Sequence, residues 1–229
     1  MHYKKIFKIV GVVAVAAVFS IGCSEKPDDD GGNTGGKGND ISNYRTVTIG
    51  TQTWMAENLD YAIEGSKCFG EGGEVIIRYG ENGPITITLS NAEMLANCAK
   101  YGRLYTWEAA NRVCPSGWHL PSDAEWTTLT DYVGSNPGTT LKSSTDWYDY
   151  SDNGVPAGTD EYRFSALPSG GGGGNGYFAE AGGERGHWWS ATAVDADNAL
   201  FRHMDFYDEN VYRGDDDKRY LKSVRCVQD

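Results

Sequence analysis

Four cysteines in the main part of the chain restrict its possible folds more than any other feature. The chain has five cysteines, and those beyond residue 60 are Cys68, Cys98, Cys114 and Cys226. In a chain that is exported, as the N-terminal residues described next indicate, an even number of cysteines favours disulfides over a metal cluster. Neither a Cys-x-x-Cys pair nor a Cys/His spacing typical of zinc occurs. We therefore predict a domain held by two disulfides; three pairings are possible, and spacing alone does not choose among them.

The first residues have the features of an export signal. Three lysines, at positions 4, 5 and 8, precede an almost unbroken apolar run over residues 9–19. A transmembrane helix needs roughly 20 residues, so this run is too short to span a bilayer. Ser20 and Gly22 are small residues at the place where a signal peptide is cut. We therefore predict a signal peptide over residues 1–22.

Cys23 indicates what kind of signal this is. Ile21-Gly22-Cys23 resembles the end of a bacterial lipobox, in which the cysteine is acylated and becomes the mature N-terminus. The box usually has leucine where this chain has Ser20; the alternative is an ordinary secreted protein in which Cys23 is removed or stays free. We predict lipidation of Cys23 and a membrane anchor through this N-terminal lipid. The expected location is the bacterial cell envelope, at the outer membrane or cell surface.

Residues 23–43 form the next segment, which is acidic and rich in glycine. It has almost no apolar residues, so it cannot bury enough surface to offset the entropy lost on ordering. We predict a lipidated cysteine followed by a disordered tether over residues 23–43, and one domain over residues 44–229. A calcium site at the aspartates 28–30 is the disfavoured alternative, because charge runs are usually solvated.

The net charge of the chain is −12. Residues 1–22 contain three lysines and no acidic residue, so the processed chain carries −15. A surface this acidic repels nucleic acid and anionic lipid headgroups. We therefore predict no nucleic-acid partner.

Two hairpins are predicted in the first half of the domain. Residues 47–49 and 52–55 flank a Gly50-Thr51 turn, and residues 75–79 and 85–89 flank Asn82-Gly83.

Helices are predicted from capping boxes, in which a serine side chain and a glutamate three residues on bond each other's backbone N–H groups. The boxes are Ser90 with Glu93 and Ser122 with Glu125. A third short helix is predicted after Thr106. The predicted helices extend from Ser90 to near Cys98, over 107–111 and over 123–133.

Beyond Gly138 the pattern is irregular and predicts mainly loops. The glycine run 170–174 is predicted to be a flexible loop, because it lacks the strand-then-helix context of a phosphate loop. Strands return at 200–206 and 220–227. Together these elements predict an α+β fold with an antiparallel sheet, two to three short helices and long loops.

Several motifs follow one another along the domain. They are Val47-Thr48-Ile49-Gly50, Trp54-Met55-Ala56-Glu57-Asn58-Leu59, Leu104-Tyr105-Thr106-Trp107, Cys114-Pro115-Ser116-Gly117-Trp118-His119-Leu120-Pro121-Ser122, Phe164-Ser165-Ala166-Leu167-Pro168, Trp188-Trp189-Ser190-Ala191-Thr192 and Val224-Arg225-Cys226-Val227. Together they resemble the Fibrobacter succinogenes major paralogous domain family over nearly all of residues 44–229. Residues 71–89 look longer than the family norm and are interpreted as an insertion.

This resemblance implies an exported or surface protein, often a lipoprotein, whose activity is largely uncharacterised. The family is distantly similar to C-type lectin-like and sulfatase-modifying-factor folds, which implies a lectin-like α+β domain. In those folds a helix near the start of the core is tied to the last strand. The resemblance therefore implies that Cys114 pairs with Cys226, which leaves Cys68 with Cys98.

The same kinship suggests two functions, and the residues argue against both. A formylglycine-generating oxidase needs reactive cysteines, but the expected disulfides use all four, and the active-site cysteine motif is absent. A calcium-dependent lectin needs a Glu-Pro-Asn or Gln-Pro-Asp triplet and a Trp-Asn-Asp triplet, and none occurs. We predict no enzymatic activity and no cofactor. A calcium site among the acidic residues of 205–217 is a minor alternative, because EF-hand spacing is missing.

Aromatic residues beside acids are the candidate ligand-binding residues. Trp147, Tyr148 and Tyr150 lie in a loop-like segment among aspartates; such rings stack on sugars while carboxylates bind hydroxyls. The alternative for Trp147 is a place in the core. Trp188 and Trp189 cannot both face the same way on a strand, so we expect one in the core and one free to lie on a binding face.

His119, His187 and His203 are scattered, without a neighbouring nucleophile or metal-ligand spacing. His119 is expected to be hydrogen-bonded within a structural motif. The first hypothesis is therefore a surface-displayed, non-catalytic binding domain for extracellular polysaccharide or a surface partner. The second is a structural or assembly protein of the outer envelope that binds another envelope protein. An enzyme of unrecognised type ranks third.

Overall fold

The computed structural model describes residues 36–80 and 83–229. The predicted signal peptide, Cys23 and the tether up to residue 35 lie outside the described residues. Residues 36–43, the end of the predicted tether, lie against the domain: Ile41 of the 3₁₀ helix η1 (Ile41–Asn43) packs on the core, and Lys37 bonds Glu57. No helix in the described ranges is long and apolar enough to cross a membrane.

Four α-helices lie within the described residues: α1 (Asn91–Tyr101), α2 (Trp107–Val113), α3 (Asp123–Val133) and α4 (Pro137–Leu141). Both capping boxes are present at the starts of α1 and α3, and the three predicted helices are confirmed. Helix α4 was not predicted, because proline, glycine and threonine are poor helix formers. A tertiary contact supports it, since Gly138 N donates to the carbonyl oxygen of Glu209 at 2.7 Å.

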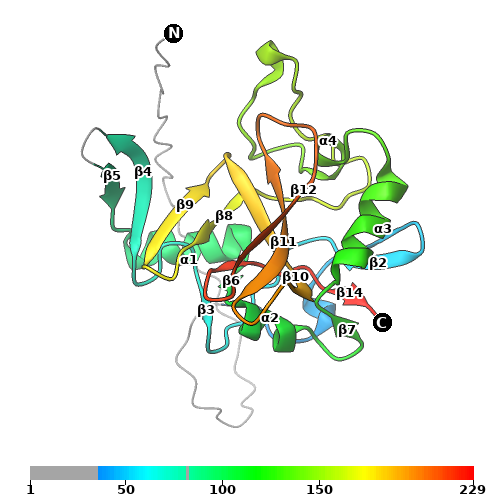
Figure 1. Cartoon of the computed structure of the whole chain (residues 1–229), viewed down its shortest axis with the longest axis horizontal. Coiled ribbons are helices and arrows are strands. Elements are labelled where there is room, and N and C mark those ends of the chain that lie inside the picture. The colour runs from blue at the N-terminus through cyan, green and yellow to red at the C-terminus, as the bar shows by residue number, and fades with distance from the viewer. Residues whose placement is uncertain (1–35, 81–82) are drawn as a thin grey trace, which may run out of the picture. The chain divides into compact units, whose positions relative to one another are not determined.

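The strands form two sheets (Figure 1). The smaller sheet has the order β1 (Thr46–Ile49), β2 (Gln52–Met55), β14 (Val227–Gln228) and β7 (Trp118–His119). The larger sheet runs β3 (Ser66–Lys67), β6 (Leu104–Tyr105), β13 (Lys222–Ser223), β10 (Arg185–Ala193), β8 (Ser169–Gly172), β9 (Tyr177–Ala181), β4 (Glu74–Gly80) and β5 (Gly83–Ile87), with β11 (Asn198–Asp205) paired to β10 and β12 (Tyr212–Asp217) paired to β11. The predicted hairpins β1–β2 and β4–β5 are confirmed.

The larger sheet is mixed, so the prediction of an antiparallel sheet is wrong for part of it. Strand β10 pairs antiparallel with β11 but parallel with β8 and β13, and β4 is parallel to β9. The predicted last strand, 220–227, is divided between β13 and β14, which belong to different sheets. Parallel pairing joins segments that are distant in sequence, and local residue patterns do not report it.

The glycine run predicted to be a flexible loop contributes most of β8, which lies between β10 and β9. Gly170 has a φ of +64°, and a Cβ there would lie 2.4 Å from the carbonyl oxygen of Ala179. Neighbouring backbone therefore approaches too closely for a side chain, and this requirement explains the glycine.

Strand β10 is buried on both faces at its two tryptophans. Trp188 packs with Trp126 of α3 in one core cluster, and Trp189 packs with Ala109 and Ala110 of α2 in another. Both indoles are fully buried, so the expectation that one of them is exposed is wrong. Successive strand residues do face opposite ways, but a helix covers each face here.

Two disulfides join distant segments. Cys114–Cys226 ties the end of α2 to the segment before β14, with a Cα–Cα distance of 5.9 Å. Cys68–Cys98 encloses the hairpin β4–β5 and ends on α1. These are the two pairs that the family resemblance implies.

Asn58, which follows β2, is a buried link between four segments. Its Oδ1 accepts hydrogen bonds from Trp188 Nε1 at 2.9 Å and from Arg225 Nε at 2.8 Å. Its Nδ2 donates to the carbonyl oxygen of Tyr101 at 2.8 Å and to Ser223 Oγ at 3.3 Å. The amide thus uses two acceptor and two donor positions, which is its full capacity.

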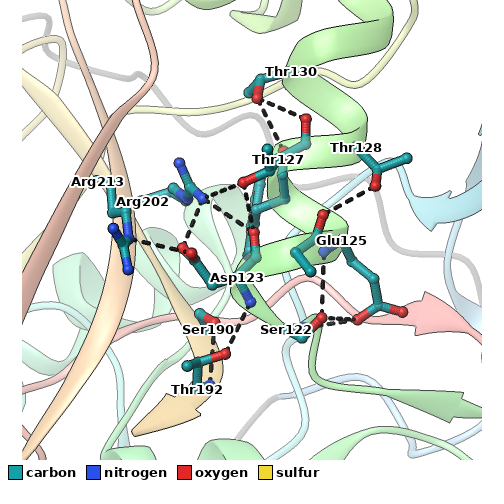
Figure 2. A network of polar contacts seen from close by, with 12 residues as sticks. Ser122, Asp123, Glu125, Thr127, Thr128, Thr130, Ser190, Thr192, Arg202 and Arg213 are labelled. Carbon is teal, nitrogen blue, oxygen red and sulfur yellow. Dashed lines mark hydrogen bonds and ion pairs between the residues drawn. The ribbon is translucent and has the colours of Figure 1, made fainter. Parts of the chain in front are cut away.

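Asp123 fixes the N-terminus of α3 to the sheet (Figure 2). Its carboxylate binds Arg202 of β11 at 2.6 Å and Arg213 of β12 at 3.2 Å. Its backbone N–H donates to Thr192 Oγ1 at 3.0 Å, and Thr127 Oγ1 accepts from Arg202. An acidic residue in the first turn also interacts favourably with the helix dipole. These contacts hold α3 over the face of the sheet that contains Trp188.

Replacement of Asn58 by alanine should lower the free energy of unfolding by about 3 kcal/mol or more, because it leaves buried groups of Trp188 and Arg225 without partners. Urea denaturation of the oxidised protein measures this change. Asn111→Ala, on the exposed side of α2, is the matched control and should change stability by about 0.5 kcal/mol or less. Equal stability of the two variants would contradict the role assigned to Asn58.

Candidate functional site

One face of β10, β11 and β12 has a layer of rings. His187 of β10 pairs in register with His203 of β11, with ring centroids 5.9 Å apart. Tyr212 of β12 stacks on His203 at 5.3 Å. Further along the same face lie Phe201 and Trp189, whose centroids are 6.3 Å apart. The layer therefore runs from the core at Trp189 to the surface at Tyr212.

Lys222 of β13 is buried against this layer. Its ammonium lies 4.1 Å from the centroid of the Phe201 ring and 4.8 Å from that of Trp189. It forms an ion pair of 2.7 Å with Asp216 of β12. Burial lowers the pKa of Lys222, and the charge of Asp216 opposes this shift. The rings and one carboxylate take the place of water around the charge.

Beside Lys222 and His187 the domain contains an open hollow of about 260 Å³. We refer to it as the hollow. It is lined by Ile76, Gly171, Gly172, Gly173, Asn175, Tyr177, Ala179, Glu180, His187, Asp216, Tyr220 and Lys222. Ligand pockets for drug-sized molecules begin at about 300 Å³, so this space suits a smaller group, such as one sugar ring.

The glycines of β8 keep the hollow open. A Cβ on Gly171 would lie 3.7 Å from the His187 ring and 3.3 Å from the carbonyl oxygen of Leu221. A side chain at this position would therefore extend into the space beside His187. Within the glycine run, Gly170 thus permits close packing of neighbouring backbone, and Gly171 leaves the space beside His187 unfilled.

Glu180 on the rim of the hollow is held by two partners. Its Oε2 accepts from His187 Nε2 at 2.9 Å, and its Oε1 accepts from Arg185 Nη1 at 2.7 Å. Burial raises the pKa of Glu180, but the hydrogen bond from His187 and the nearby positive charges outweigh it, so the pKa lies below its ordinary value. Burial lowers the pKa of His187 to about 4. At neutral pH a neutral imidazole therefore donates to a carboxylate.

Three lining residues have polar groups available for a ligand. The hydroxyls of Tyr177 and Tyr220 and the Nδ2 group of Asn175 make no hydrogen bond to any other residue that the structure describes. Tyr220 is 38% exposed. The hollow thus combines aromatic rings with unused donors and acceptors, as pockets for small ligands commonly do.

Next to the hollow lie four aromatic residues that we refer to as the aromatic cluster: Tyr148, Tyr150, Phe206 and Tyr207. The centroids of Tyr148, Tyr150 and Tyr207 lie 5.6, 5.4 and 5.1 Å from that of Phe206, each ring edge-on to it. Tyr148 N donates to the carbonyl oxygen of Gly183 at 3.0 Å, which places the cluster at the β9–β10 turn. Tyr148 and Tyr207 are 43% and 44% exposed.

Trp147 does not belong to this surface. Its ring is buried, its Nε1 donates to the carbonyl oxygen of Ala166 at 2.9 Å, and Lys142 Nζ lies 5.3 Å from its centroid. Trp147 therefore packs in the core, as the alternative interpretation expected. Of the five predicted ligand-binding residues, Trp147, Trp188 and Trp189 are core residues, and Tyr148 and Tyr150 lie outside the core.

A second pocket, of about 300 Å³, lies between residues 37–60, the end of α1 and the loop 143–167. Among its lining residues Lys37 pairs with Glu57 at 2.8 Å, and Lys100 pairs at 2.6 Å with Asp146, which lies outside the lining. Oδ1 of the buried Asp60 has no hydrogen-bond partner among the described residues. We take the hollow as the candidate site because it combines aromatic rings with hydroxyl and amide groups that have no hydrogen-bond partner among the described residues.

The remaining predicted polar residues have structural contacts. His119 bonds Glu125 at 2.8 Å and Asp229 at 2.7 Å, as expected for a hydrogen-bonded residue of a structural motif. Within residues 36–80 and 83–229, no group of three or more His, Cys, Asp and Glu side chains is placed to hold a metal ion.

The polar residues of the hollow were not predicted as site residues from the sequence: Glu180, His187, Asp216 and Lys222. They lie on four strands, β9, β10, β12 and β13, and strand register brings them together. The alternation of Arg185, His187 and Trp189 could have indicated one face of a strand, but β10 was not among the predicted strands.

Comparison with known proteins gives one match. Residues 47–228 match the family model described as the Fibrobacter succinogenes major domain (Fib_succ_major), which confirms the resemblance found in the sequence. No curated protein and no solved structure matches the chain. The matched range contains the whole hollow and the whole aromatic cluster.

The titration of His187 should lower the free energy of unfolding as the pH falls from about 6.5 to about 4. The pKa of His187 is lowered from 6.5 to about 4 in the folded state, so within this window the unfolded chain binds a proton that the folded chain does not. A shift of this size corresponds to a loss on the order of 3 kcal/mol across the window. The measurement is urea denaturation at pH 7 and pH 4.5.

The control is the His187→Gln variant, which keeps a donor to Glu180 and cannot titrate. Asp60 has the opposite effect on stability. Burial raises its pKa to about 6, so the folded chain binds a proton below that pH that the unfolded chain does not. The informative quantity is therefore the stability of the wild type minus that of the variant. A difference that is the same at both pH values would contradict the burial of a neutral His187.

Proposed function

We propose that this chain, which belongs to the Fibrobacter succinogenes major domain family, is a non-catalytic binding module for extracellular polysaccharide. The hollow is the proposed site, and it holds one sugar unit of the polymer. The supporting observation is its combination of two tyrosines, the available Nδ2 group of Asn175 and three glycines in a space of about 260 Å³.

The charges around the hollow favour a neutral polymer. Glu180 and Asp216 are both partly exposed on its rim, while Lys222 is buried and paired with Asp216. The chain as a whole has a net charge of −12. An acidic polysaccharide would be repelled from this rim, whereas neutral hydroxyls can donate to both carboxylates.

The state of Glu180 supports binding rather than hydrolysis. A glycosidase needs a carboxylic acid whose pKa is raised, so that it can protonate the leaving oxygen. The pKa of Glu180 is instead lowered by its contacts with His187 and Arg185. Glu180 is therefore a stable acceptor for sugar hydroxyls.

The proposal includes display at the cell envelope. Disulfides of this kind form in exported proteins, and both pairs are present. Lipidation at Cys23, followed by a tether, would hold the domain outside the membrane. A C-type lectin-like fold for the domain remains part of this proposal.

An envelope protein as partner is the second candidate, and the hairpin β4–β5 is the observation that favours it. Strand β5 is the last strand of its sheet, and Ile85 and Ile87 are exposed on it. Tyr79 on β4 is 75% exposed. Exposed apolar residues at a sheet edge can bind another protein.

Binding to insoluble and soluble polysaccharides tests the first proposal. The full-length protein, purified in a detergent without a sugar headgroup, should be retained by a neutral polymer. Tyr220→Ala removes a ring of the hollow and Gly171→Val fills it, so each should weaken retention about tenfold or more. Titration of retained protein against polymer concentration gives the affinity.

Tyr132→Ala is the matched control, because Tyr132 is a strongly exposed tyrosine on α3 outside the lining of the hollow. Its affinity should equal that of the wild type. Equal losses in Tyr132→Ala and Tyr220→Ala would sink the assignment of the hollow. Absence of retention on every neutral polymer, together with crosslinking to an envelope protein, would favour the second candidate.

A further inference from the structure

We infer that the binding surface does not end at the hollow but continues along β9 and β10 to the aromatic cluster. The partner is then an internal stretch of a linear neutral polysaccharide that occupies two subsites at once. This inference rests on the proposed function and names the class of polymer and the way it is held.

Direct contacts connect the two subsites. His187 lines the hollow and bonds Glu180 at 2.9 Å. Glu180 bonds Arg185 Nη1 at 2.7 Å, and Arg185 Nη2 donates to the hydroxyl of Tyr207 at 3.1 Å. Tyr207 belongs to the aromatic cluster. The surface between the subsites is therefore a bonded polar bridge with Arg185 at its centre.

Arg185 suits this bridge because its charge is balanced. It pairs with Glu180 and, through Nε, with Asp205, so two carboxylates flank one guanidinium. These contacts and the one to Tyr207 use three of the five N–H groups of arginine, and the other two have no partner among the residues that the structure describes. The bridge can thus donate to hydroxyls without attracting a polyanion.

The aromatic cluster is held rigid before any ligand arrives. Tyr148, Tyr150 and Tyr207 stand at 83°, 87° and 87° to the plane of Phe206, so one ring supports three. Tyr148 is also hydrogen-bonded through its backbone to Gly183. Rings fixed in this way lose little conformational entropy when a sugar stacks on them. The cluster is therefore a preformed second subsite.

The order of the hollow, the polar bridge and the aromatic cluster along the surface matches a chain of sugar rings. A hollow for one ring, a polar bridge and an aromatic platform follow one another along β9 and β10. A pyranose polymer offers apolar ring faces and hydroxyl edges in the same repeating way. The hollow accepts one unit, so the units that follow it must lie on the bridge and the platform.

Titration calorimetry with oligosaccharide ladders tests the inference on the full-length protein. The probes are cello-, xylo- and manno-oligosaccharides of one to six units, with oligogalacturonides as the acidic comparison. In the oligosaccharide series that binds, the affinity for six units should exceed that for one unit by about tenfold or more, because the second subsite adds its contacts. Oligogalacturonides of the same length should bind at least tenfold more weakly.

Two variants separate the subsites. Tyr148→Ala combined with Tyr207→Ala should reduce the affinity ratio between six units and one unit to near one. Tyr220→Ala should weaken the affinity for every oligosaccharide length by the same factor. Tyr132→Ala should change neither the affinities nor the ratio between six units and one unit.

The outcomes separate this inference from the proposed function. Affinity that depends on Tyr220 but not on chain length would overturn the second subsite and leave the hollow as a site for a single unit. A length dependence that survives the loss of Tyr148 and Tyr207 would also overturn it. If no neutral ladder binds, both proposals fail.

Discussion

The buried amide of Asn58 is the contact on which the arrangement of the domain depends. It satisfies the indole of Trp188 on the central strand and the guanidinium of Arg225 in the C-terminal segment. Arg225 also donates to the carbonyl oxygens of Phe164 and Ser165, so the loop after α4 is fixed to the same point. A buried guanidinium without these acceptors would be strongly unfavourable. The two sheets and this loop therefore have one favourable arrangement.

Strand β10 positions several residues of the candidate site on this scaffold. Trp188 and Trp189 bury both of its faces against α3 and α2, and their packing fixes the register of the strand. Arg185 and His187, earlier on the same strand, are thereby held in position, Arg185 near the surface and His187 buried beside the hollow. The hollow forms beside them because β8 consists largely of glycine. The disulfide Cys68–Cys98 keeps β4, which contributes a wall residue, within a closed loop.

Local signals predicted elements whose partners are close in the chain. The capping boxes at Ser90 and Ser122 gave the starts of α1 and α3, because both members of each box lie within four residues. The hairpins were predictable for the same reason. The disulfide pairs followed from family resemblance and not from spacing. Helix α4 and the strand at Gly170 were missed, since each depends on backbone contacts with residues far along the sequence.

The sequence by itself determined the family, the α+β class and the elements stabilised by near neighbours. Tertiary structure alone decided which aromatic side chains face solvent: Trp147 and Tyr148 are adjacent, yet only Tyr148 is exposed. It also assembled the hollow, because Glu180, His187 and Lys222 meet through the pairing of strands. That pairing is set by the burial of distant apolar residues on both faces of β10. The spacing of the polar residues along the chain does not indicate this strand pairing.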